Sequence, residues 1–599
     1  MPKITIDGQE YQIAKATTIL KACEELGIII PNLCYLDGVS EEASCSICLV
    51  EVEGAKTLMR ACVTEVTDGM VIRTNTERVR KGRLLNLELL LASHPQDCFV
   101  CERNQNCQLR RLAFEMGIQR VRFSKETSIS LPIDQSSSAI VRDPNKCILC
   151  RRCTAVCEKI QSVRAIEAIN RGKRTRISTF MDRGLGNSSC VNCGQCLLVC
   201  PTGALVENYH IQGVWKALSD NQKFVVVETA PAVRASIGEE FGLAAGSRIT
   251  GKMVAALRRL GFKKVFDTQF SADLTIMEEA HELIHRIKNK GPLPLITSCS
   301  PGWIKFAEHF YPKVLKHISS CKSPQQMFGA VAKTYYAKKI GIDPRKIVVV
   351  SIMPCTAKKF EAHRPEMDAA FRYWKNVMNL DEKEHFVDVD FVLTTREAAR
   401  MMKEAGIDFT RLADEEFDEP LGISTGAAVV FGATGGVMEA ALRTAYEVLT
   451  NQPLSDVEFK QVRGLEGIKT AELDLNGLLL KVAVANSLSN ARVLLEEVQN
   501  GKSPYTFIEI MTCPGGCLGG GGQPIPTDTQ TRQKRMEAIY EEDRSKSVRK
   551  SHENPAIKQI YQEFLGKPLS ELSHQLLHTH YHERNELDTP FLLNKTVKI

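Results

Sequence analysis

The chain has 599 residues, which is too many for one hydrophobic core and predicts several domains. Hydrophobic residues make up 43% and charged residues 25%, which is typical of a folded globular protein and excludes a disordered, collagen-like or membrane-array protein. A net charge of +6 over this length does not predict a nucleic-acid partner. The N-terminus lacks a secretory signal and no apolar run reaches the ~18 residues that span a bilayer, so we expect a cytoplasmic protein without a membrane segment. Disulfides would not account for 21 cysteines in such a protein.

Residues 1–78 predict a small α+β domain. Short strands (KITIDG, YQIA, CLVEVEG and VIRTNT) surround one helix near residues 18–26. Cysteines with the spacing C-x10-C-x2-C…C lie in this domain, at Cys34, Cys45, Cys48 and Cys62. The domain resembles a plant-type ferredoxin, so we expect these thiolates to hold a 2Fe-2S cluster, with a zinc site as the alternative. Cys23, on the helix, is predicted to be a buried thiol.

Residues 79–125 predict a second metal-binding domain, which begins with the helical segment RVRKGRLLNLELLLASH. The pattern H-x3-C-x2-C-x5-C follows, formed by His94, Cys98, Cys101 and Cys107. We expect a 4Fe-4S cluster, and one imidazole in place of a thiolate would make it less negative and raise its potential. Zinc is again the alternative.

Residues 138–209 contain the pattern C-x2-C-x2-C-x3-C twice. In the bacterial two-cluster ferredoxins the fourth cysteine of each run ligates the other cluster. The pattern therefore predicts one 4Fe-4S cluster on Cys147, Cys150, Cys153 and Cys200, and another on Cys190, Cys193, Cys196 and Cys157. Residues 141–186 carry eleven Lys or Arg and four Asp or Glu, a net charge of +7. These cations would offset the negative clusters and could face an acidic electron-transfer partner, although a solvated basic face is the simpler interpretation.

From about residue 222 the pattern changes to apolar strands alternating with amphipathic helices. It includes FVVVETA then AVRASIGEEF, KKVFDT then DLTIMEEAHELIHRIKN, and DFVLT then TREAARMMKEAG, which is typical of an α/β domain with a largely parallel sheet. Three cysteine-containing segments follow apolar strands: LPLITSCSPGW, KIVVVSIMPCTAKK and FIEIMTCPGGCLGGGGQP. Because the carboxyl ends of parallel strands meet at one edge of a sheet, we expect these segments to converge on a common crevice.

These segments carry a family resemblance. TSCSPGW, MPCTAKKFE and MTCPGGCLGGGGQP resemble the three signature motifs of the iron-only (FeFe) hydrogenases, and the order of the preceding clusters is that of their large bacterial forms. The length and the segment SHENPAIKQIYQEFLGKPL resemble the catalytic subunit of NAD(P)-linked, multi-subunit hydrogenases. The resemblance implies a multidomain α+β and α/β protein: ferredoxin-like iron-sulfur modules, an α/β H-cluster domain over residues 210–525, and a helical, small-subunit-like segment over residues 526–599.

The resemblance also implies an H-cluster, in which a 4Fe-4S cubane is joined to a di-iron unit that carries CO, cyanide and azadithiolate. Cys355 and Cys513 would hold the cubane, and Cys517 would bridge it to the di-iron unit. Lys358 would donate a hydrogen bond to a cyanide, unless it is a surface lysine. The remaining implied pocket residues are Ala230, Pro231, Met353, Met511 and Phe431.

The first motif departs from the family pattern. Two adjacent cysteines are expected, the first as proton donor and the second as cubane ligand, but the chain has Cys299 and Ser300. A hydroxyl is a harder and far less acidic ligand than a thiol, so it would shift the cluster's potential. Either Ser300 ligates as an alkoxide, or Cys299 takes over, or the position stays open.

A proton path is implied next to this motif. Glu279 and Glu282 lie three residues apart, so both project from one helix face, and Arg286 follows one turn later. With Ser319 and Cys299 they match the family's proton path. Without the resemblance, two glutamates on a helix would indicate an acidic solvent face.

We therefore predict a hydrogenase that interconverts dihydrogen with protons and electrons. No G-x-G-x-x-G follows a strand, so a diaphorase-like NAD(P)-binding subunit or a ferredoxin would exchange the electrons, and maturation proteins would supply the di-iron unit. The alternatives are a complex I or formate dehydrogenase-type electron-transfer subunit and a non-catalytic sensory or assembly-type member of the family. We expect GATGGVMEA to allow close backbone packing, HQLLHTHYH to be a polar tail, and Cys321 to be buried near the cluster without ligating it.

Overall fold

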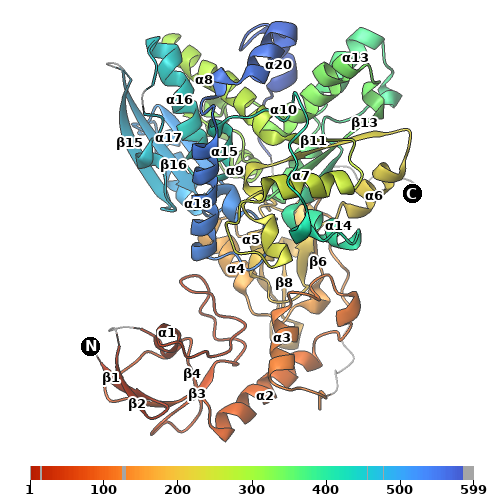
Figure 1. The fold of residues 1–599 in the computed structure, drawn as a ribbon. Helices are drawn as coiled ribbons and strands as arrows, with labels where there is room; N and C mark the ends of the chain where they lie inside the picture. Colours follow the sequence, from red (N-terminus) through yellow and green to blue (C-terminus); the bar gives the residue numbers. More distant parts are fainter. Residues whose placement is uncertain (1, 14–16, 124–129, 455, 476–477, 585–599) are drawn as a thin grey trace. The chain divides into compact units, whose positions relative to one another are not determined.

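The computed structural model describes residues 2–13, 17–123, 130–454, 456–475 and 478–584 (Figure 1). Contacts divide the chain into two compact units. Unit 1 comprises Met1–Ile160, Arg164–Ser188 and Gln195–Val206, and unit 2 comprises Gln161–Val163, Ser189–Gly194 and Glu207–Ile599. No helix among the described residues is both long enough and apolar enough to cross a bilayer. The finer division into five domains stays a prediction.

Unit 1 begins with a five-stranded sheet in the order β2-β1-β5-β3-β4. Its strands are β1 (Lys3–Ile6), β2 (Gln9–Gln12), β3 (Leu49–Val52), β4 (Met59–Arg60) and β5 (Val71–Arg73). Strands β1 and β5 are parallel, and the other neighbours are antiparallel. Helix α1 (Ile19–Glu25) begins where the Thr18 hydroxyl accepts the N–H of Lys21. Its buried face includes Cys23, which confirms the predicted buried thiol. The structure therefore confirms the predicted strands and the predicted helix. The short strand β4 was not predicted.

The rest of unit 1 combines the 16-residue helix α2 (Glu77–Ala92) with short elements, and its cysteines lie in loops and in short helices. The short elements are α3 (Gln108–Glu115), β6 (Ile140–Arg142), α4 (Arg152–Ala155), β7 (Glu167–Ile169), β8 (Arg176–Ser178), α5 (Gln195–Val199) and β9 (Leu205–Glu207). Strands β6 and β9 pair, as do β7 and β8. Arg83 fixes α2 to the first sheet, because its Nε and Nη2 donate to the carbonyl oxygen of Leu49 at 3.0 and 2.7 Å.

Unit 2 contains two four-stranded sheets, where the sequence predicted one. The first, in the order β11-β10-β13-β14, is entirely parallel. Its strands are β10 (Phe224–Thr229), β11 (Lys264–Asp267), β13 (Ile347–Met353) and β14 (Phe391–Thr394). Every residue of β13 is buried, as expected for a parallel strand covered on both faces.

The second sheet has the order β12-β17-β16-β15. Its strands are β12 (Leu295–Ile296), β15 (Ile468–Leu475), β16 (Leu478–Asn486) and β17 (Phe507–Met511). Strand β17 is parallel to both neighbours, and β15 and β16 form an antiparallel hairpin that was not predicted. Helix α17 (Leu488–Gln499) packs on β16, and α16 (Gly436–Thr450) on β15 and β17 (Figure 1).

The remaining helices of unit 2 surround these sheets. They are α6 (Ile211–Ser219), α7 (Thr250–Arg259), α8 (Thr268–Lys288), α9 (Pro301–Phe310), α10 (Pro324–Val331), α11 (Ala337–Ile340), α12 (Ala357–Ala362), α13 (Ala369–Met378), α14 (Thr395–Glu404), α15 (Gly426–Val429), α18 (Thr529–Ser545), α19 (Pro555–Ile560) and α20 (Glu571–Leu577). The segment AVRASIGEEF was expected to be a helix, but it contains two separate 3-10 turns. The side chain of Arg234 between them is buried and donates to Asp267 at 2.8 Å, so a tertiary contact outweighs the local pattern.

The C-terminal helices are part of the core of unit 2. Met536 and Ile539 of α18 pack into the same hydrophobic cluster as α15 and α16. Arg443 of α16 donates to both carboxylate oxygens of Asp543 at 3.0 and 2.9 Å and to Glu439 at 2.6 Å, and all three side chains are fully buried. The prediction of a helical segment is confirmed for the described residues up to 584, and its burial in the core of unit 2 was not predicted.

The buried cluster around Arg443 predicts a large stability effect. Arg443→Ala leaves Arg463 and Arg549 as the remaining cations of the buried Glu439 and Asp543 carboxylates. We therefore expect a cost somewhat below the ~3–5 kcal/mol of a buried charge that loses its only partner. We expect a clear fall in the midpoint of thermal unfolding of the full chain. Arg400→Ala is the control, because its ion pair with Glu404 on α14 is solvent-exposed and worth far less. Equal effects of the two substitutions would contradict this assignment.

Candidate active site

The three cysteine-containing segments converge on one cavity in unit 2. The cavity has a volume of about 80 Å³, and its lining is almost entirely apolar. All the side chains that the resemblance placed at the H-cluster line it: Ala230, Pro231, Cys299, Ser300, Met353, Cys355, Lys358, Phe431, Met511, Cys513 and Cys517. The expected crevice thus exists, but the strand ends that form it belong to both sheets.

Glycines allow the loops around the cavity to approach one another. A Cβ atom on Gly520 would lie 2.1 Å from the carbonyl oxygen of Pro354, so the loop that carries Cys517 rests directly on the loop that carries Cys355. Gly516 has a φ of +79°, and a Cβ atom there would lie 2.8 Å from the Thr434 nitrogen. The glycine-rich motif therefore sets the distance between thiols from separate strands.

GATGGVMEA also permits close backbone packing, as predicted. A Cβ atom on Gly436 would lie 1.7 Å from the carbonyl oxygen of Val430, and one on Gly435 would lie 1.9 Å from that of Val462. The close approach of Gly436 to Val430 holds the short turn that presents Phe431 to the cavity.

The donor set fits an iron-sulfur cluster. Cys355, Cys513 and Cys517 form no disulfide and face the same cavity. Burial raises the pKa of the Cys355 thiol, and it raises that of Cys517 to about 12. Thiols in so apolar a place are neutral on their own and become thiolates when they bind a metal.

Sequence reasoning missed Thr268, Pro324 and Gln325, which also line the cavity. Gln325 Nε2 donates to the Lys358 carbonyl at 3.3 Å, and its Oε1 is buried with no hydrogen-bond partner in the described part of the chain. An orphaned buried polar atom at a cavity wall indicates a group that is completed by a ligand or water. The Pro-Gln pair that begins α10 was the available signal, but nothing in its spacing distinguishes it from an ordinary helix start.

Lys358 supplies a positive charge at the cavity wall. Its Nζ donates to Glu361 at 2.8 Å and to the carbonyl oxygen of Cys299 at 3.2 Å. Glu361 is held in turn by the Ser323 hydroxyl at 2.9 Å. The ammonium group is thus fixed beside Cys299 and Cys355 and is not a surface lysine.

Ser300 lies directly before α9, where Pro301 occupies the first helical position. Its Oγ lies 2.7 Å from the Thr512 hydroxyl and accepts the Thr512 N–H at 3.2 Å. Two polar hydrogens of Thr512 can therefore point at the oxygen that replaces the expected sulfur. Thr512 precedes Cys513, so this contact joins two of the three motifs.

The groups of the implied proton path lie on or next to α8. Glu282 Oε2 accepts the Ser319 hydroxyl at 2.8 Å, and Glu282 Oε1 accepts Arg286 Nη2 at 2.6 Å. Neither carboxyl oxygen of Glu279 has a hydrogen-bond partner within the described residues. Burial, together with the charge of Glu282, raises the pKa of Glu279 to about 8. Burial, and next the charge of Glu279, raises the pKa of the Cys299 thiol well above its usual range. Glu279 and Glu282 are buried, and the charge of Glu282 shifts the pKa of Glu279. They are therefore not an acidic solvent face.

In unit 1 the predicted thiols also gather. Cys147, Cys150, Cys153 and Cys200 line one small cavity, which is the grouping expected when the fourth cysteine of one run completes the other site. Cys48 Sγ and Cys62 Sγ lie 3.3 Å apart. Backbone N–H groups donate to the sulfurs of Cys107 and Cys147 at 3.4 Å, and such bonds help to tune cluster potentials.

The family comparisons agree with this organisation. Residues 223–521 match the description "Iron only hydrogenase large subunit, C-terminal domain", and residues 529–584 match "Iron hydrogenase small subunit". The front of the chain matches a 2Fe-2S iron-sulfur cluster binding domain at residues 2–77, an NADH-ubiquinone oxidoreductase-G iron-sulfur binding region at residues 83–122, and a 4Fe-4S dicluster domain at residues 146–204.

Two relatives cover almost the whole chain. The NADP-reducing hydrogenase subunit HndD of Solidesulfovibrio fructosivorans is 49% identical over 98% of this chain and all of its own length. Iron hydrogenase 1 of Clostridium pasteurianum is 42% identical over 97% of this chain and all of its own length. Among solved structures, a variant of FeFe-hydrogenase HydA1 from Chlamydomonas reinhardtii is 43% identical, with a TM-score of 0.55 over 62% of this chain and 99% of that chain.

The fold and the site thus define an iron-sulfur oxidoreductase with an H-cluster. The chain belongs to the iron-only hydrogenases, the enzymes that interconvert dihydrogen with protons and electrons. Both full-length relatives are named hydrogenases, so the sensory, assembly and complex I-type alternatives are not favoured. The module that matches the NADH-ubiquinone oxidoreductase is confined to residues 83–122, and the H-cluster domain begins well after it.

Proposed function

We propose that this hydrogenase relays electrons between its H-cluster and a separate electron-exchanging partner through four accessory clusters. The observation that carries the proposal is the convergence of the motif cysteines, the lysine and the methionines on one apolar cavity. The accessory clusters would be one 2Fe-2S and three 4Fe-4S. Their ligands would be Cys34, Cys45, Cys48 and Cys62; His94, Cys98, Cys101 and Cys107; Cys147, Cys150, Cys153 and Cys200; and Cys190, Cys193, Cys196 and Cys157.

At the H-cluster, Cys355 and Cys513 would hold the cubane and Cys517 would bridge it to the di-iron unit. We propose Ser300 as the fourth cubane ligand. The contacts from Thr512 support this choice, because an N–H and a hydroxyl directed at Oγ would stabilise the negative charge of an alkoxide. Lys358, held by Glu361, would donate to a cyanide.

When bound, the H-cluster supplies the iron site at which dihydrogen is split or formed. The chain supplies the dry cavity and the proton carriers. Burial keeps the Cys299 thiol protonated at the cavity wall, so its Sγ can give up a proton only when another group replaces that proton. Glu279 is protonated at neutral pH and can serve as that group. Ser319, Glu282 and Arg286, already joined by hydrogen bonds, would continue the path away from the cavity.

The proposed partner is a diaphorase-like NAD(P)-binding subunit or a ferredoxin. A relative named as a subunit of an NADP-reducing hydrogenase, aligned over its whole length, supports the first. Maturation proteins would provide the di-iron unit. A cytoplasmic location stays a prediction.

Infrared spectroscopy can test whether Ser300 ligates the cubane. After maturation we expect CO and cyanide bands, because these ligands belong to the di-iron unit. Ser300→Cys should keep the bands but shift them, since a thiolate changes the charge that the cubane presents to the di-iron unit. Ser300→Ala should weaken or abolish them, because the cubane loses a ligand. Bands from Ser300→Ala that are identical to those of the starting protein would show that Ser300 does not ligate, and no bands from any matured sample would overturn the proposed function.

Glu279→Gln tests the proton path. An amide cannot carry the proton, so we expect hydrogen evolution to fall by about 10²–10⁴-fold, the usual contribution of a positioned proton-transfer group. The CO and cyanide bands should persist. The starting enzyme should lose activity as the pH rises past about 8, because Glu279 then loses its proton, and this loss should be absent in the variant. Glu404→Gln, on the exposed face of α14, is the control. Full activity of Glu279→Gln would exclude this residue from the path.

The electron partner can be tested with the chain alone. Under dihydrogen the matured chain should reduce a one-electron viologen dye, because the accessory clusters pass single electrons. It should not reduce NAD⁺ or NADP⁺, because the sequence lacks a dinucleotide-binding fingerprint. Reduction of either nucleotide by the isolated chain would contradict the need for a separate subunit.

A further inference from the structure

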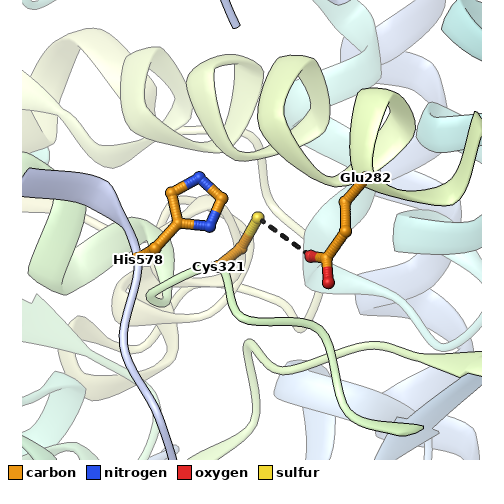
Figure 2. A group of neighbouring side chains, drawn as sticks. All are labelled: Glu282, Cys321 and His578. Atoms are coloured by element: carbon orange, nitrogen blue, oxygen red, sulfur yellow. Dashed lines mark hydrogen bonds between the residues drawn. The ribbon is translucent and has the colours of Figure 1, made fainter. Parts of the chain in front are cut away.

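Two buried glutamates of α8 have basic partners. Arg286 Nη2 lies 2.6 Å from Glu282 Oε1, and His578 Nε2 lies 3.1 Å from Glu278 Oε2. Figure 2 shows the side chains of Glu282 and His578 on either side of Cys321. The imidazole is 300 residues away from Glu278 in the sequence, so a basic partner for a buried carboxylate can come from a distant part of the chain.

Backbone pairing brings His578 to this place. Residues 577–579 lie antiparallel to residues 320–322, with N–H to carbonyl distances of 2.7 Å at both ends of the bridge. His578 is buried, with 7% of its surface exposed. The expectation of a polar tail was wrong at this residue, because His578 belongs to the interior of unit 2.

Glu228, in contrast, is buried without a basic partner. It lies in β10, its exposed fraction is 0%, and no Lys, Arg or His in the described ranges forms an ion pair with it. Two hydroxyl groups bond to its carboxyl group instead: Thr268 Oγ1 donates to Oε2 at 2.7 Å, and Ser351 Oγ donates to Oε1. Ser351 lies opposite Glu228 on β13, and Thr268 directly follows β11. The neighbouring strands on both sides of β10 thus place the two hydroxyls.

Burial makes the neutral form of Glu228 the stable one. It raises the pKa of this carboxyl group to about 8, while the two hydroxyls and the charge of Lys358 act in the opposite direction. Glu361 is the other charged group that acts on Glu228, and it offsets Lys358, with which it is paired at 2.8 Å. On the β11 side, Asp267 is paired with Arg234 at 2.8 Å. Glu228 therefore carries a proton at neutral pH.

The proton on Glu228 determines where the Thr268 hydroxyl can point. An ionised carboxylate accepts the hydrogen atoms of both hydroxyls. A protonated Oε2 donates to Thr268 Oγ1 instead, and the single hydroxyl hydrogen of Thr268 then becomes available to another acceptor. Of the two hydroxyl residues, Thr268 is the one that lines the H-cluster cavity. An acceptor inside the cavity would therefore favour this arrangement.

We propose that Thr268 donates a hydrogen bond from the cavity wall to a cyanide of the H-cluster, and that Glu228 is the residue that positions its hydroxyl. The proposal rests on the proposed function, because the acceptor belongs to the di-iron unit. Cyanide is anionic and ends in a nitrogen acceptor, which strengthens such a bond. Thr268 would be a second donor at the cavity wall besides Lys358. A donor to cyanide withdraws electron density from the iron, so Thr268 would tune the cofactor and Glu228 would act only through Thr268.

Infrared spectra of the matured enzyme test the donor. Thr268→Val removes the hydroxyl and keeps the shape of the side chain. The CO and cyanide bands should persist, and the CO bands should shift to lower frequency, because the iron returns more electron density to CO when the cyanide loses its donor. Bands identical to those of the starting protein would overturn the proposal.

Thr229→Val is the matched control. Thr229 is the residue next to Glu228 on β10, its side chain is buried, and its hydroxyl has no hydrogen-bond partner among the residues that the structure describes. It does not line the cavity, so the same loss of a hydroxyl should leave the bands in place. A shift as large as that of Thr268→Val would show that general repacking, and not the donor, moves the bands.

The pH dependence of the bands tests the positioning role of Glu228. In the starting enzyme the CO bands should move toward those of Thr268→Val as the pH rises past about 8, because ionised Glu228 takes back the hydroxyl hydrogen. Glu228→Gln should keep the low-pH bands throughout, because its amide N–H donates to Thr268 as the protonated carboxyl does. Glu279→Gln should still show the shift, which separates Glu228 from the other buried glutamate of similar pKa. A pH-dependent shift that persists in Glu228→Gln would overturn the positioning role.

A titration without the di-iron unit tests the protonation of Glu228 itself. Before maturation, the infrared spectrum of the chain should contain a protonated-carboxyl C=O band that is lost as the pH rises past about 8. Part of this loss should be absent from Glu228→Gln. A loss of equal size in the variant would overturn the protonation on which the positioning depends.

The proposed function and this inference fail in different ways. Absence of CO and cyanide bands from every matured sample would overturn the proposed function and, with it, the acceptor of Thr268. Unchanged bands in Thr268→Val, together with the expected loss of activity in Glu279→Gln, would overturn this inference alone.

Discussion

The contact between Gly520 and Pro354 is the constraint on which the catalytic cavity depends. It presses the loop after β17 against the loop after β13, at a separation that leaves no room for a side chain on Gly520. The thiols of Cys517 and Cys355 consequently face the same space, although they come from different sheets. A Cβ atom at position 520 would collide with the carbonyl group of Pro354, so only glycine permits this separation of the two loops.

The charged groups around this contact are buried, and most of them are paired with other side chains of the protein. Lys358 is fixed by Glu361, and Glu282 by Arg286 and Ser319. Glu279 is the exception, since its buried carboxyl oxygens meet no hydrogen-bond partner in the parts of the chain that the structure describes. A neutral, protonated carboxyl is the stable form in that environment, which suits the proton carrier that we propose.

The parts of the protein that could be predicted from sequence are those specified by local spacing. The cysteine runs, the strands before them and the glycine-rich motif each occupy a few consecutive residues, and the structure brings together the cysteines of the catalytic cavity and those of the group Cys147, Cys150, Cys153 and Cys200 as expected. The division into two sheets could not be predicted, because strand order depends on contacts between segments hundreds of residues apart. The turns in AVRASIGEEF follow from the pairing of Arg234 with Asp267, and the role of Gln325 follows from its place at the cavity wall; neither has a local signature. His578 was misjudged for the same reason, since its burial depends on pairing with a loop more than 250 residues earlier.

That pairing affects the order in which the catalytic unit can be completed. Residues 320–322 lie in the loop next to the proposed proton carriers, and their backbone partners at residues 577–579 are among the last described residues to be synthesised. Contacts between segments so far apart in the chain form late, because a long loop must close first. Until that closure, the loop at residues 320–322 lacks these backbone partners, whereas the β10 and β13 strand ends at the cavity are already translated. The pairing of residues 577–579 with residues 320–322 can thus form only after strands β10 and β13 have been translated.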